Sequence, residues 1–344
     1  MSGGAERIMK RPTIRDVAAA AGVSKSLVSM VYSREDGVSP ERRERVLAAA
    51  QKLGFTPNQW ARSLASGSGN FIGILVVDLH NLIYTEVADL ARRALLERGQ
   101  QTFMAAAIIS ERKGKKFVEK STIQALLDLR PNGIIVVGDL PEESALASIP
   151  DTVPIVKTIA TLRKKDRAVS IRSDDKEAMS LVVRHLRMRG HKKIQYIGPT
   201  DGAVSDERLA AFKLAMEDQG LTPKVSTCER TEAAANSAAK AALAEKNPPT
   251  ALVFFNDVLA VGAQQAVADH VAAGKPFVAV TGFDNTYLSE LSQISLTTIE
   301  PEKEAIALKA AEQITDPELV ASMAGQEILM VPRLIVRKST DSSL

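Results

Sequence analysis

The stretch DVAAAAGVSKSLVSMV, residues 16–31, decides the fold of the N-terminal part of the chain. Four alanines favour a helix, which Gly22 interrupts before a second helical run begins. Ala18, Gly22 and Val28 have the spacing of a helix-turn-helix, in which they allow the helices to approach, form the turn and pack the second helix onto the first. The motif predicts two helices that cross steeply, an arrangement that can place the second helix against DNA.

The residues around this stretch are typical of helix ends. Thr13 is a candidate N-cap with Asp16 as its capping-box partner, and Gly22 suits the left-handed position after the first helix. Ser24 can cap the second helix. Ser39 can cap the third helix, with Pro40 at its first position. We therefore expect a flexible tail over 1–12, a three-helix DNA-binding domain over 13–56, and a linker over 57–70 that contains a short helix, PNQWARSLASG (57–67).

The second helix has one apolar side and one polar side. Val17, Val23 and Val31 complete the apolar side of the helix pair, which leaves an outer face at i, i+4 spacing. This face contains Lys25, Ser26, Ser29 and Met30. Ser24 and Lys25 at the helix N-terminus can meet phosphates or base edges. An alanine-rich helical pair with a solvated face remains the alternative interpretation of the motif alone.

Charge is distributed unevenly along the chain. Residues 1–70 contain 11 Lys and Arg against 6 Asp and Glu, whereas the remaining residues contain 33 against 35. A small basic part joined to a large, nearly neutral part is typical of a protein in which one part contacts nucleic acid.

Composition narrows the class of protein. Cys228 is the single cysteine, so no intrachain disulfide can form, and we expect a cytoplasmic location without a secretion signal or membrane span. The four histidines are scattered, and the chain has no GxGxxG, P-loop, GxSxG or HExxH motif. These observations argue against an enzyme and against a metal or other cofactor.

From Phe71 onward, short apolar runs alternate with amphipathic helical segments. The expected helices are 82–98, 115–129, 205–219 and 257–273, and the apolar runs between them indicate parallel strands buried on both faces. Two such series predict two Rossmann-like α/β lobes over 71–344 with a cleft between them.

Polar residues follow several of these strands, where doubly wound sheets bind their ligands. They are Asp78, His80, Asn81, Tyr84, Ser205, Arg208, Asn256, Asp257, Asp284 and Asn285. Planar arginine and carboxylate groups suit a polyhydroxylated ligand. A structural pairing of Arg208 is the alternative.

Residues 13–340 resemble the LacI/GalR (lactose-repressor) family of bacterial transcription regulators. The matching segments include TIRDVA, AGVS, ERV, LGFTPN and ARSL in the head, and RPNGIIVVG, RGHKKIQYIGP, DERLAAF, PPTALVFFND, VTGFDN, LTTIEP and VRKST in the large part. The resemblance implies an α-helical helix-turn-helix head joined to a two-lobed, periplasmic-binding-protein-like α/β effector domain over 71–344. It implies lobe one over about 71–169 and 299–325, and lobe two over about 170–298 and 326–344. It implies a regulator, most often a repressor, that binds a pseudopalindromic operator in double-stranded DNA as a homodimer and responds to a small molecule, such as a sugar.

The resemblance also implies roles for matched residues in DNA binding. Lys25, Ser26 and Met30 match base-reading positions, and Thr13, Ser24 and Ser29 match phosphate contacts. The segment 57–67 resembles the family's hinge helix, in which Leu64 would enter the minor groove and Asn58 and Ala61 would face the backbone. The family often has arginine at Met30 and asparagine at Ser33, so we expect an operator half-site that differs at the base read by Met30.

In the cleft, the matched Asp78, Arg208, Asp257 and Asp284 often hydrogen-bond sugars or nucleobases in the family. This sequence departs from the pattern of the sugar-responsive members at two places. Ile159 and Ala160 replace an Asp-Arg pair, and Ala107 and Ile108 replace an Asn-Thr pair. A carbohydrate derivative, a less polar metabolite, or no inducer at all therefore remain open, as does a two-lobed sugar-binding protein without a regulatory role.

Overall fold

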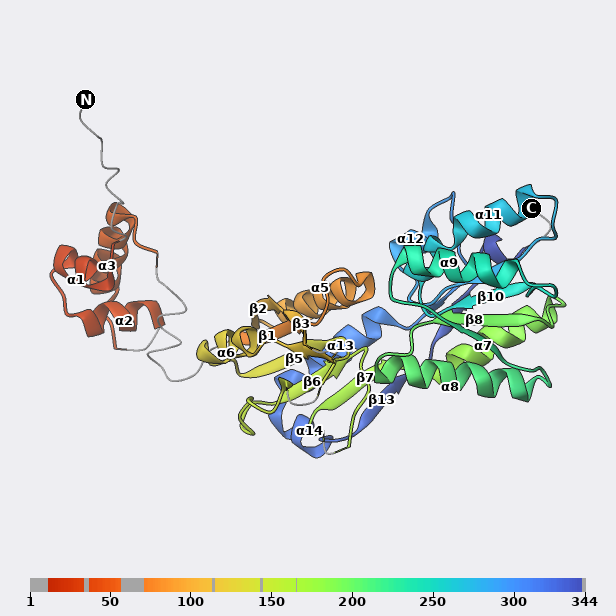
Figure 1. Ribbon diagram of the computed structural model, residues 1–344. Helices are drawn as coiled ribbons and strands as arrows, with labels where there is room; N and C mark the ends of the chain where they lie inside the picture. Colours follow the sequence, from red (N-terminus) through yellow and green to blue (C-terminus); the bar gives the residue numbers. More distant parts are fainter. Residues whose placement is uncertain are drawn as a thin grey trace, which may run out of the picture. The chain divides into compact units, whose positions relative to one another are not determined.

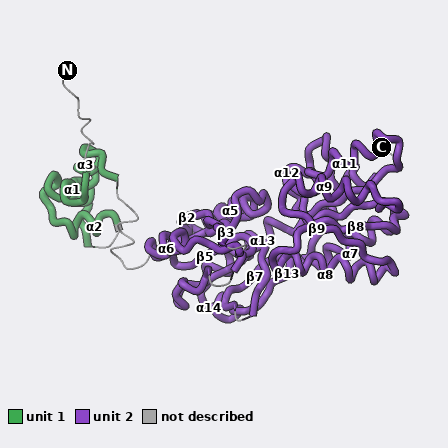
Figure 2. Tube along the Cα trace, viewed as in Figure 1, with its two compact units in different colours: residues 1–67 green, residues 68–344 purple. Residues whose placement is uncertain are grey.

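A computed structural model describes residues 12–33, 37–56, 71–112, 115–142, 145–164 and 166–341. The chain forms two compact units, residues 1–67 and residues 68–344 (Figure 2). In the ranges described, no helix has the length and apolar character needed to cross a membrane.

The first unit contains three helices: α1 (Ile14–Ala21), α2 (Lys25–Ser33) and α3 (Pro40–Leu53) (Figure 1). Small side chains allow the helices to approach closely around one core. This core consists of Val17, Ala18, Ala21, Val28, Val31, Val46 and Ala50. Burial of Ala18 and Val28 confirms the steric roles that their spacing predicts.

The helix ends follow the local sequence. The Asp16 carboxylate accepts a hydrogen bond from the Thr13 backbone N–H at 2.7 Å, and Thr13 Oγ1 accepts one from Asp16 N, which completes a capping box. Gly22 has φ 63° and ψ 40°, the left-handed conformation that ends α1. The predicted caps at Ser24 and Ser39 also form, each with a hydrogen bond from a backbone N–H in the following turn.

The first lobe of the second unit is built on a six-stranded parallel sheet with the order β13-β7-β6-β5-β1-β2. The strands are β1 (Phe71–Val76), β2 (Gln101–Ala106), β5 (Gly133–Val137), β6 (Ile155–Thr158), β7 (Val169–Ser173) and β13 (Glu327–Met330). Helices α5 (Leu82–Glu97) and α13 (Lys303–Thr315) pack on one face, and α6 (Lys120–Asp128) packs on the other (Figure 1). The short helix α14 (Pro317–Ser322) precedes β13.

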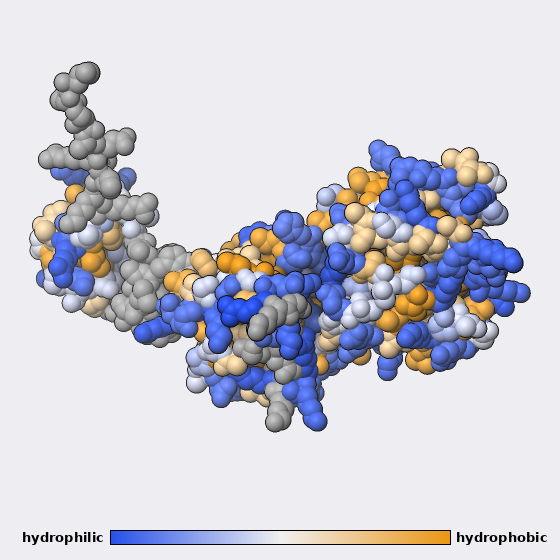
Figure 3. Space-filling view, in the orientation of Figure 1, coloured by the Kyte–Doolittle hydropathy of each residue, from blue (hydrophilic) through white to orange (hydrophobic). Residues whose placement is uncertain are grey.

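The second lobe contains a four-stranded parallel sheet with the order β11-β10-β8-β9. The strands are β8 (Ile194–Gly198), β9 (Lys224–Thr227), β10 (Ala251–Phe254) and β11 (Ala279–Thr281). The helices are α7 (Asp175–Met188), α8 (Ala203–Asp218), α9 (Glu232–Leu243), α10 (Asp257–Gly262), α11 (Gln264–Ala272) and α12 (Tyr287–Glu290). Figure 3 shows hydrophilic residues over much of the visible surface of this unit, with apolar residues between them.

Short elements complete the unit. Strands β12 (Thr298–Glu300) and β14 (Arg333–Ile335) pair antiparallel close to the places where the chain passes between the lobes. Strands β3 (Ile109–Arg112) and β4 (Lys115–Val118) form an antiparallel pair, and a 3-10 helix, η2 (Lys338–Thr340), lies near the C-terminus.

Three details of the predicted organisation need correction. The lobe boundaries at 169/170 and 325/326 are displaced, because β7 continues to Ser173 and β13 pairs with it in the first sheet, so the crossings lie near 174 and 331. The helix expected at 115–129 begins at Lys120, because residues 115–118 pair with β3. The helix expected at 257–273 is two helices, α10 and α11, with Ala263 between them.

Candidate functional site

The exposed face of α2 is the candidate DNA-binding surface. Lys25, Ser26 and Ser29 are exposed and Met30 is half-buried. Ser24 Oγ accepts a hydrogen bond from Leu27 N at 3.2 Å, so Ser24 caps the helix that carries these side chains. The structure therefore places Lys25 at the N-terminus of α2, where helix dipole and side chain both favour an anionic partner.

A third helix fixes the opposite end of α2. Arg43 on α3 donates a hydrogen bond from Nη1 to the Val31 carbonyl oxygen at 2.9 Å. Sequence reasoning did not identify this contact, because its partners lie on different helices. Thr13 lies exposed at the start of α1. Asn58, Ala61 and Leu64, the predicted hinge-helix contacts, lie outside the described residues and stay predictions.

The second unit contains a cleft of about 1420 Å³. Its first-lobe wall includes Asp78, Asn81, Tyr84 and Asp139, and its second-lobe wall includes Asp201, Arg230 and Phe255. The volume exceeds the ~300–1,000 Å³ typical of small-molecule pockets, so a ligand can enter together with water.

The predicted residues after β1 lie together at the cleft. The Asp78 carboxylate accepts a hydrogen bond from His80 N at 2.9 Å, while the His80 side chain itself is fully exposed. Asn81 is the N-cap residue of α5 but forms no side-chain capping bond. Burial raises the pKa of Tyr84 to about 12, so its hydroxyl stays protonated at neutral pH. A Cβ at Gly138 would lie 2.4 Å from the Tyr84 ring, so this glycine is needed for the ring's position.

Arg208 is buried beneath the cleft rather than on its lining. Its Nε donates to Asp175 Oδ1 and its Nη1 to the Phe255 carbonyl oxygen, both at 2.8 Å. The guanidinium carbon lies 3.4 Å from the ring centroid of Phe283 and 4.7 Å from that of Phe255. A structural pairing and a position next to the cleft are thus both present, and they do not exclude each other.

Asp284 is the predicted residue with unused hydrogen-bonding capacity. It is buried, has φ 102°, follows β11, and does not line the cleft. Burial raises the pKa of its carboxyl group well above the usual range, and the Arg208 charge opposes this rise. Within the described parts of the chain, no hydrogen bond reaches the Asp284 side chain. Such a group is costly unless a partner, protein or ligand, completes its hydrogen bonds.

Ser205, Asn256 and Asp257 have structural partners and do not line the cleft. Ser205 Oγ accepts a hydrogen bond from Arg230 Nη2 at 2.7 Å, and Asn256 caps α10 through Leu259 N at 3.0 Å. Asp257 is buried and accepts hydrogen bonds from two threonines, Thr286 and Thr298. Burial raises the pKa of Asp257 to about 7, although these hydrogen bonds lower it.

Several cleft residues were missed by sequence reasoning. Lys116 Nζ lies 3.0 Å from Asp201 Oδ2 and joins the two lobes, and Arg230 Nε lies 3.2 Å from Asp201 Oδ1. Burial raises the pKa of Asp139, against the lowering effect of Arg163. Asp139 follows β5 as Asp78 follows β1, so its position after a predicted strand could have identified it as a cleft residue. Lys116 and Arg230 carry no comparable local signal.

The positions where the sequence departs from the family pattern lie at different depths. Ile159 and Ala160 are buried, and Ile159 has φ 53°. Ala107 lines the cleft beside Ala106 and Val77, whereas Ile108 is exposed. The cleft therefore has an apolar strip on its first-lobe side.

Comparisons with known proteins agree with this architecture. The family described as bacterial regulatory proteins, lacI family, matches residues 13–58, and a periplasmic binding protein-like domain matches residues 183–340. The HTH-type transcriptional regulator AscG of Escherichia coli K12 is 31% identical over 299 residues, which cover 84% of this chain and 86% of that protein. The regulator DegA of Bacillus subtilis 168 is 28% identical over 337 residues, covering 96% and 98%.

One solved structure has a similar fold. The lac repressor dimer bound to operator and the anti-inducer ONPF has a TM-score of 0.82 at 24% identity, over 96% of this chain and 99% of that chain. The comparisons confirm the predicted resemblance and fold class, and the relatives are transcriptional regulators rather than enzymes. The chain therefore belongs to the lacI family of bacterial regulatory proteins and is a transcriptional regulator.

Proposed function

We propose that this regulator represses transcription from a pseudopalindromic operator, which it binds as a homodimer through α2, and that an uncharged, hydroxyl-bearing molecule in the cleft changes its operator affinity. One helix-turn-helix covers a half-site, so two copies are needed to read a palindrome. The fold shared with a dimer bound to operator and ligand supports this arrangement. We place this activity in the cytoplasm.

The observation that carries the effector proposal is the Asp284 carboxyl group, buried without a hydrogen-bond partner in the described chain and near Arg208. A ligand hydroxyl can supply the missing donor. Asp284 does not itself line the cleft, but its charge acts on Tyr84, which does. A ligand that reached Asp284 from the cleft would contact both lobes.

Three basic groups next to the cleft favour a neutral ligand. Arg208 is paired with Asp175, and both Arg230 and Lys116 are paired with Asp201. An anionic ligand bound at these groups would have to displace a carboxylate, whereas a neutral polyol needs only donors and acceptors. Arg112, Lys115 and Lys120 also line the cleft, and the charged comparator below tests whether they bind an anion. The apolar strip at Ala107 suits the less polar face of a sugar or its derivative.

A thermal-shift panel tests the effector proposal. The probes are glucose, galactose, ribose and cellobiose, with glucose 6-phosphate as the charged comparator. We expect at least one neutral sugar to raise the Tm, and Asp284→Asn to weaken its binding about tenfold, because a neutral amide oxygen replaces the carboxylate as acceptor of the ligand hydroxyl. The matched control is Asp218→Asn, whose side chain is exposed at the end of α8. Stronger binding of the phosphate, or equal binding by Asp284→Asn, would overturn the proposal.

Selection from random duplexes tests the DNA-binding part. We expect the full-length protein to enrich a pseudopalindrome and to retain it at physiological salt far better than a scrambled duplex of the same composition. Equal retention of both duplexes would contradict sequence-specific binding.

A further inference from the structure

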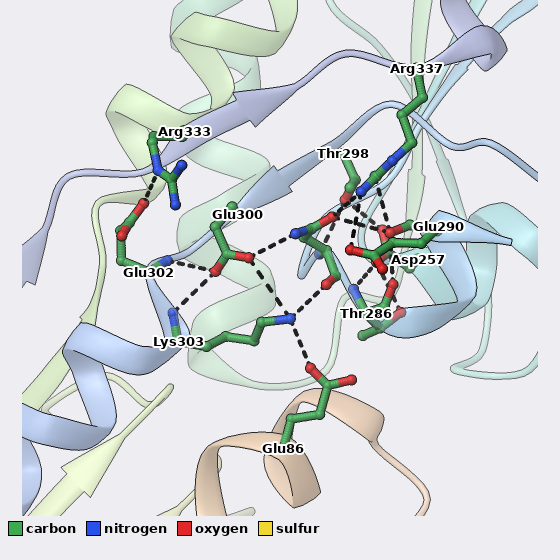
Figure 4. A network of polar contacts seen from close by, with 12 residues as sticks. Glu86, Asp257, Thr286, Glu290, Thr298, Glu300, Glu302, Lys303, Arg333 and Arg337 are labelled. Carbon is green, nitrogen blue, oxygen red and sulfur yellow. Dashed lines mark hydrogen bonds and ion pairs between the residues drawn. The ribbon is translucent and has the colours of Figure 1, made fainter. Parts of the chain in front are cut away.

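The start of α13 carries a lysine whose ammonium group is held by three chain segments. Lys303 Nζ lies 2.7 Å from Glu86 Oε2, donates to the Asn285 carbonyl oxygen at 2.6 Å, and lies 3.9 Å from Glu300 Oε2 (Figure 4). Only 13% of the Lys303 side chain is exposed. Charge-assisted bonds at such a partly buried position are among the stronger polar contacts in proteins.

The three partners come from both lobes. Glu86 points toward Lys303 from α5, a helix of the first lobe (Figure 4). Asn285 follows β11 of the second lobe, and Glu300 ends β12, just before the chain enters α13 of the first lobe. One ammonium group therefore joins two lobes at a point where the chain passes between them.

The backbone around this lysine is held in uncommon conformations. Asp284, Asn285 and Glu302 have φ values of 102°, 45° and 67°, a region that residues with a Cβ rarely adopt. Glu300 and Arg337 bind the Asn285 side chain, each at 2.8 Å (Figure 4). Such conformations persist where surrounding contacts determine them, and they concentrate at binding and switching sites.

This network is continuous along the chain with the start of α5, which lines the cleft, and with Asp284, which does not line it. Asp284 precedes Asn285 in the chain, and Asn81 and Tyr84 precede Glu86 at the start of α5. Lys303 does not line the cleft; it lines a separate, smaller cavity beside α5. It can therefore act on a ligand only through the residues that it holds.

We propose that Lys303 is a positioning residue that fixes the Asp284–Asn285 turn against α5 and so sets the separation of the two cleft walls. The proposal rests on the effector function proposed for the cleft. It assigns Lys303 the regulation of that site: a ligand that moves the Asp284 turn also moves α5, because both are attached to the same ammonium group.

Amide hydrogen exchange of the full-length protein without ligand tests the mechanical link. In Lys303→Met, we expect exchange about tenfold faster in the 82–90 segment and in the 282–287 turn, as expected for loss of a charge-assisted bond. Lys303→Arg, which keeps the charge, should restore most of the protection. Lys309→Met is the matched control, since Lys309 on the same helix pairs, among the residues that the structure describes, only within that helix, with Glu312 at 3.0 Å.

Three outcomes would overturn the proposal. Faster exchange confined to α13 would show that Lys303 stabilises only its own helix, and a uniform rise that includes α9 would show a general loss of stability. Any sugar of the panel above that stabilises the wild type should bind Lys303→Met about tenfold more weakly, and unchanged binding would also contradict the proposal. If no sugar binds the wild type, the effector function fails, while the exchange experiment still decides the link.

Discussion

The carboxylate of Asp175 lies 2.8 Å from Nε of Arg208, and both side chains are more than nine-tenths buried. The other oxygen of Asp175 lies 3.1 Å from Nη1 of Arg172, which also pairs with Glu207 and Glu327. Arg172 belongs to the sheet of the first lobe, whereas Asp175 begins the first helix of the second. A predicted effector residue is thus connected through one carboxylate to a chain crossing.

Removal of the Asp175 charge should destabilise the second unit strongly. Asp175→Asn leaves two buried guanidinium groups without their shared partner, and breaking a buried ion pair in this way typically costs about 3–5 kcal/mol. Urea unfolding of the full-length protein measures the change in the free energy of unfolding. Asp89→Asn is the control: Asp89 pairs with Arg92 and Arg93 at the surface, where a pair contributes ~1 kcal/mol or less. Equal losses in the two variants would contradict a structural role for Asp175.

The sequence predicted best the features that depend on neighbouring residues. The capping box at Thr13, the left-handed Gly22 and the caps of α2 and α3 all involve residues within about four positions of one another. The parallel sheets were also predictable, because a strand buried on both faces leaves a continuous apolar run.

At the cleft, the position of a polar residue just after a strand did not separate ligand contacts from structural residues. This criterion selected Asp78 and Tyr84, which line the cleft, together with Asn256 and Asp257, which cap or support α10. A polar residue between a strand and a helix fits an N-cap as well as a ligand contact, so sequence alone does not separate these roles.

Contacts between distant segments left no signal in the sequence. Lys116 and Asp201 are separated by 85 positions, and β13 joins the first sheet 154 positions after the end of β7, counted from Ser173 to Glu327. Neither depends on local periodicity. The lobe boundaries were therefore misplaced, and the pair that bridges the cleft was not foreseen.

Because Asp257 holds a proton in the folded protein up to about pH 7, the free energy of unfolding should fall as pH rises. Its pKa is raised from 3.8 to about 7 in the folded protein, so between these values the folded state holds a proton that the unfolded chain has lost. The free energy of unfolding then decreases with rising pH, by about 1.4 kcal/mol per pH unit from this group. The stabilisation is complete below the unfolded pKa and lost by about pH 7.

Asp257→Asn tests this dependence, because the amide does not titrate. We expect the variant to be less stable overall and its free energy of unfolding to depend less on pH across this window, as measured by urea unfolding at several pH values. Asp218→Asn, at an exposed position, should keep the wild-type slope. An unchanged slope in Asp257→Asn would show that Asp257 does not take up the proton.

Lys25 should contribute to sequence-specific binding. It is exposed at the N-terminus of α2, the helix expected to enter the major groove. Lys25→Ala should weaken binding to the selected operator more than binding to random duplex, because a base contact is lost in one complex only. Fluorescence anisotropy at fixed salt measures both affinities, and Lys213→Ala on α8 serves as the control. Equal losses on both duplexes would make Lys25 a phosphate contact.

Met30 should determine which base is preferred at one position of each half-site. Methionine can pack on a thymine methyl group but lacks the paired donors with which arginine binds guanine O6 and N7. Met30→Arg should therefore shift the preference at that position toward guanine by about 1–3 kcal/mol, while the remaining positions keep their preferences. Parallel selections with the wild type and the variant, compared position by position, measure the shift. A wild-type selection that already enriches guanine there, or a variant with the same preference as the wild type, would show that Met30 does not read this base.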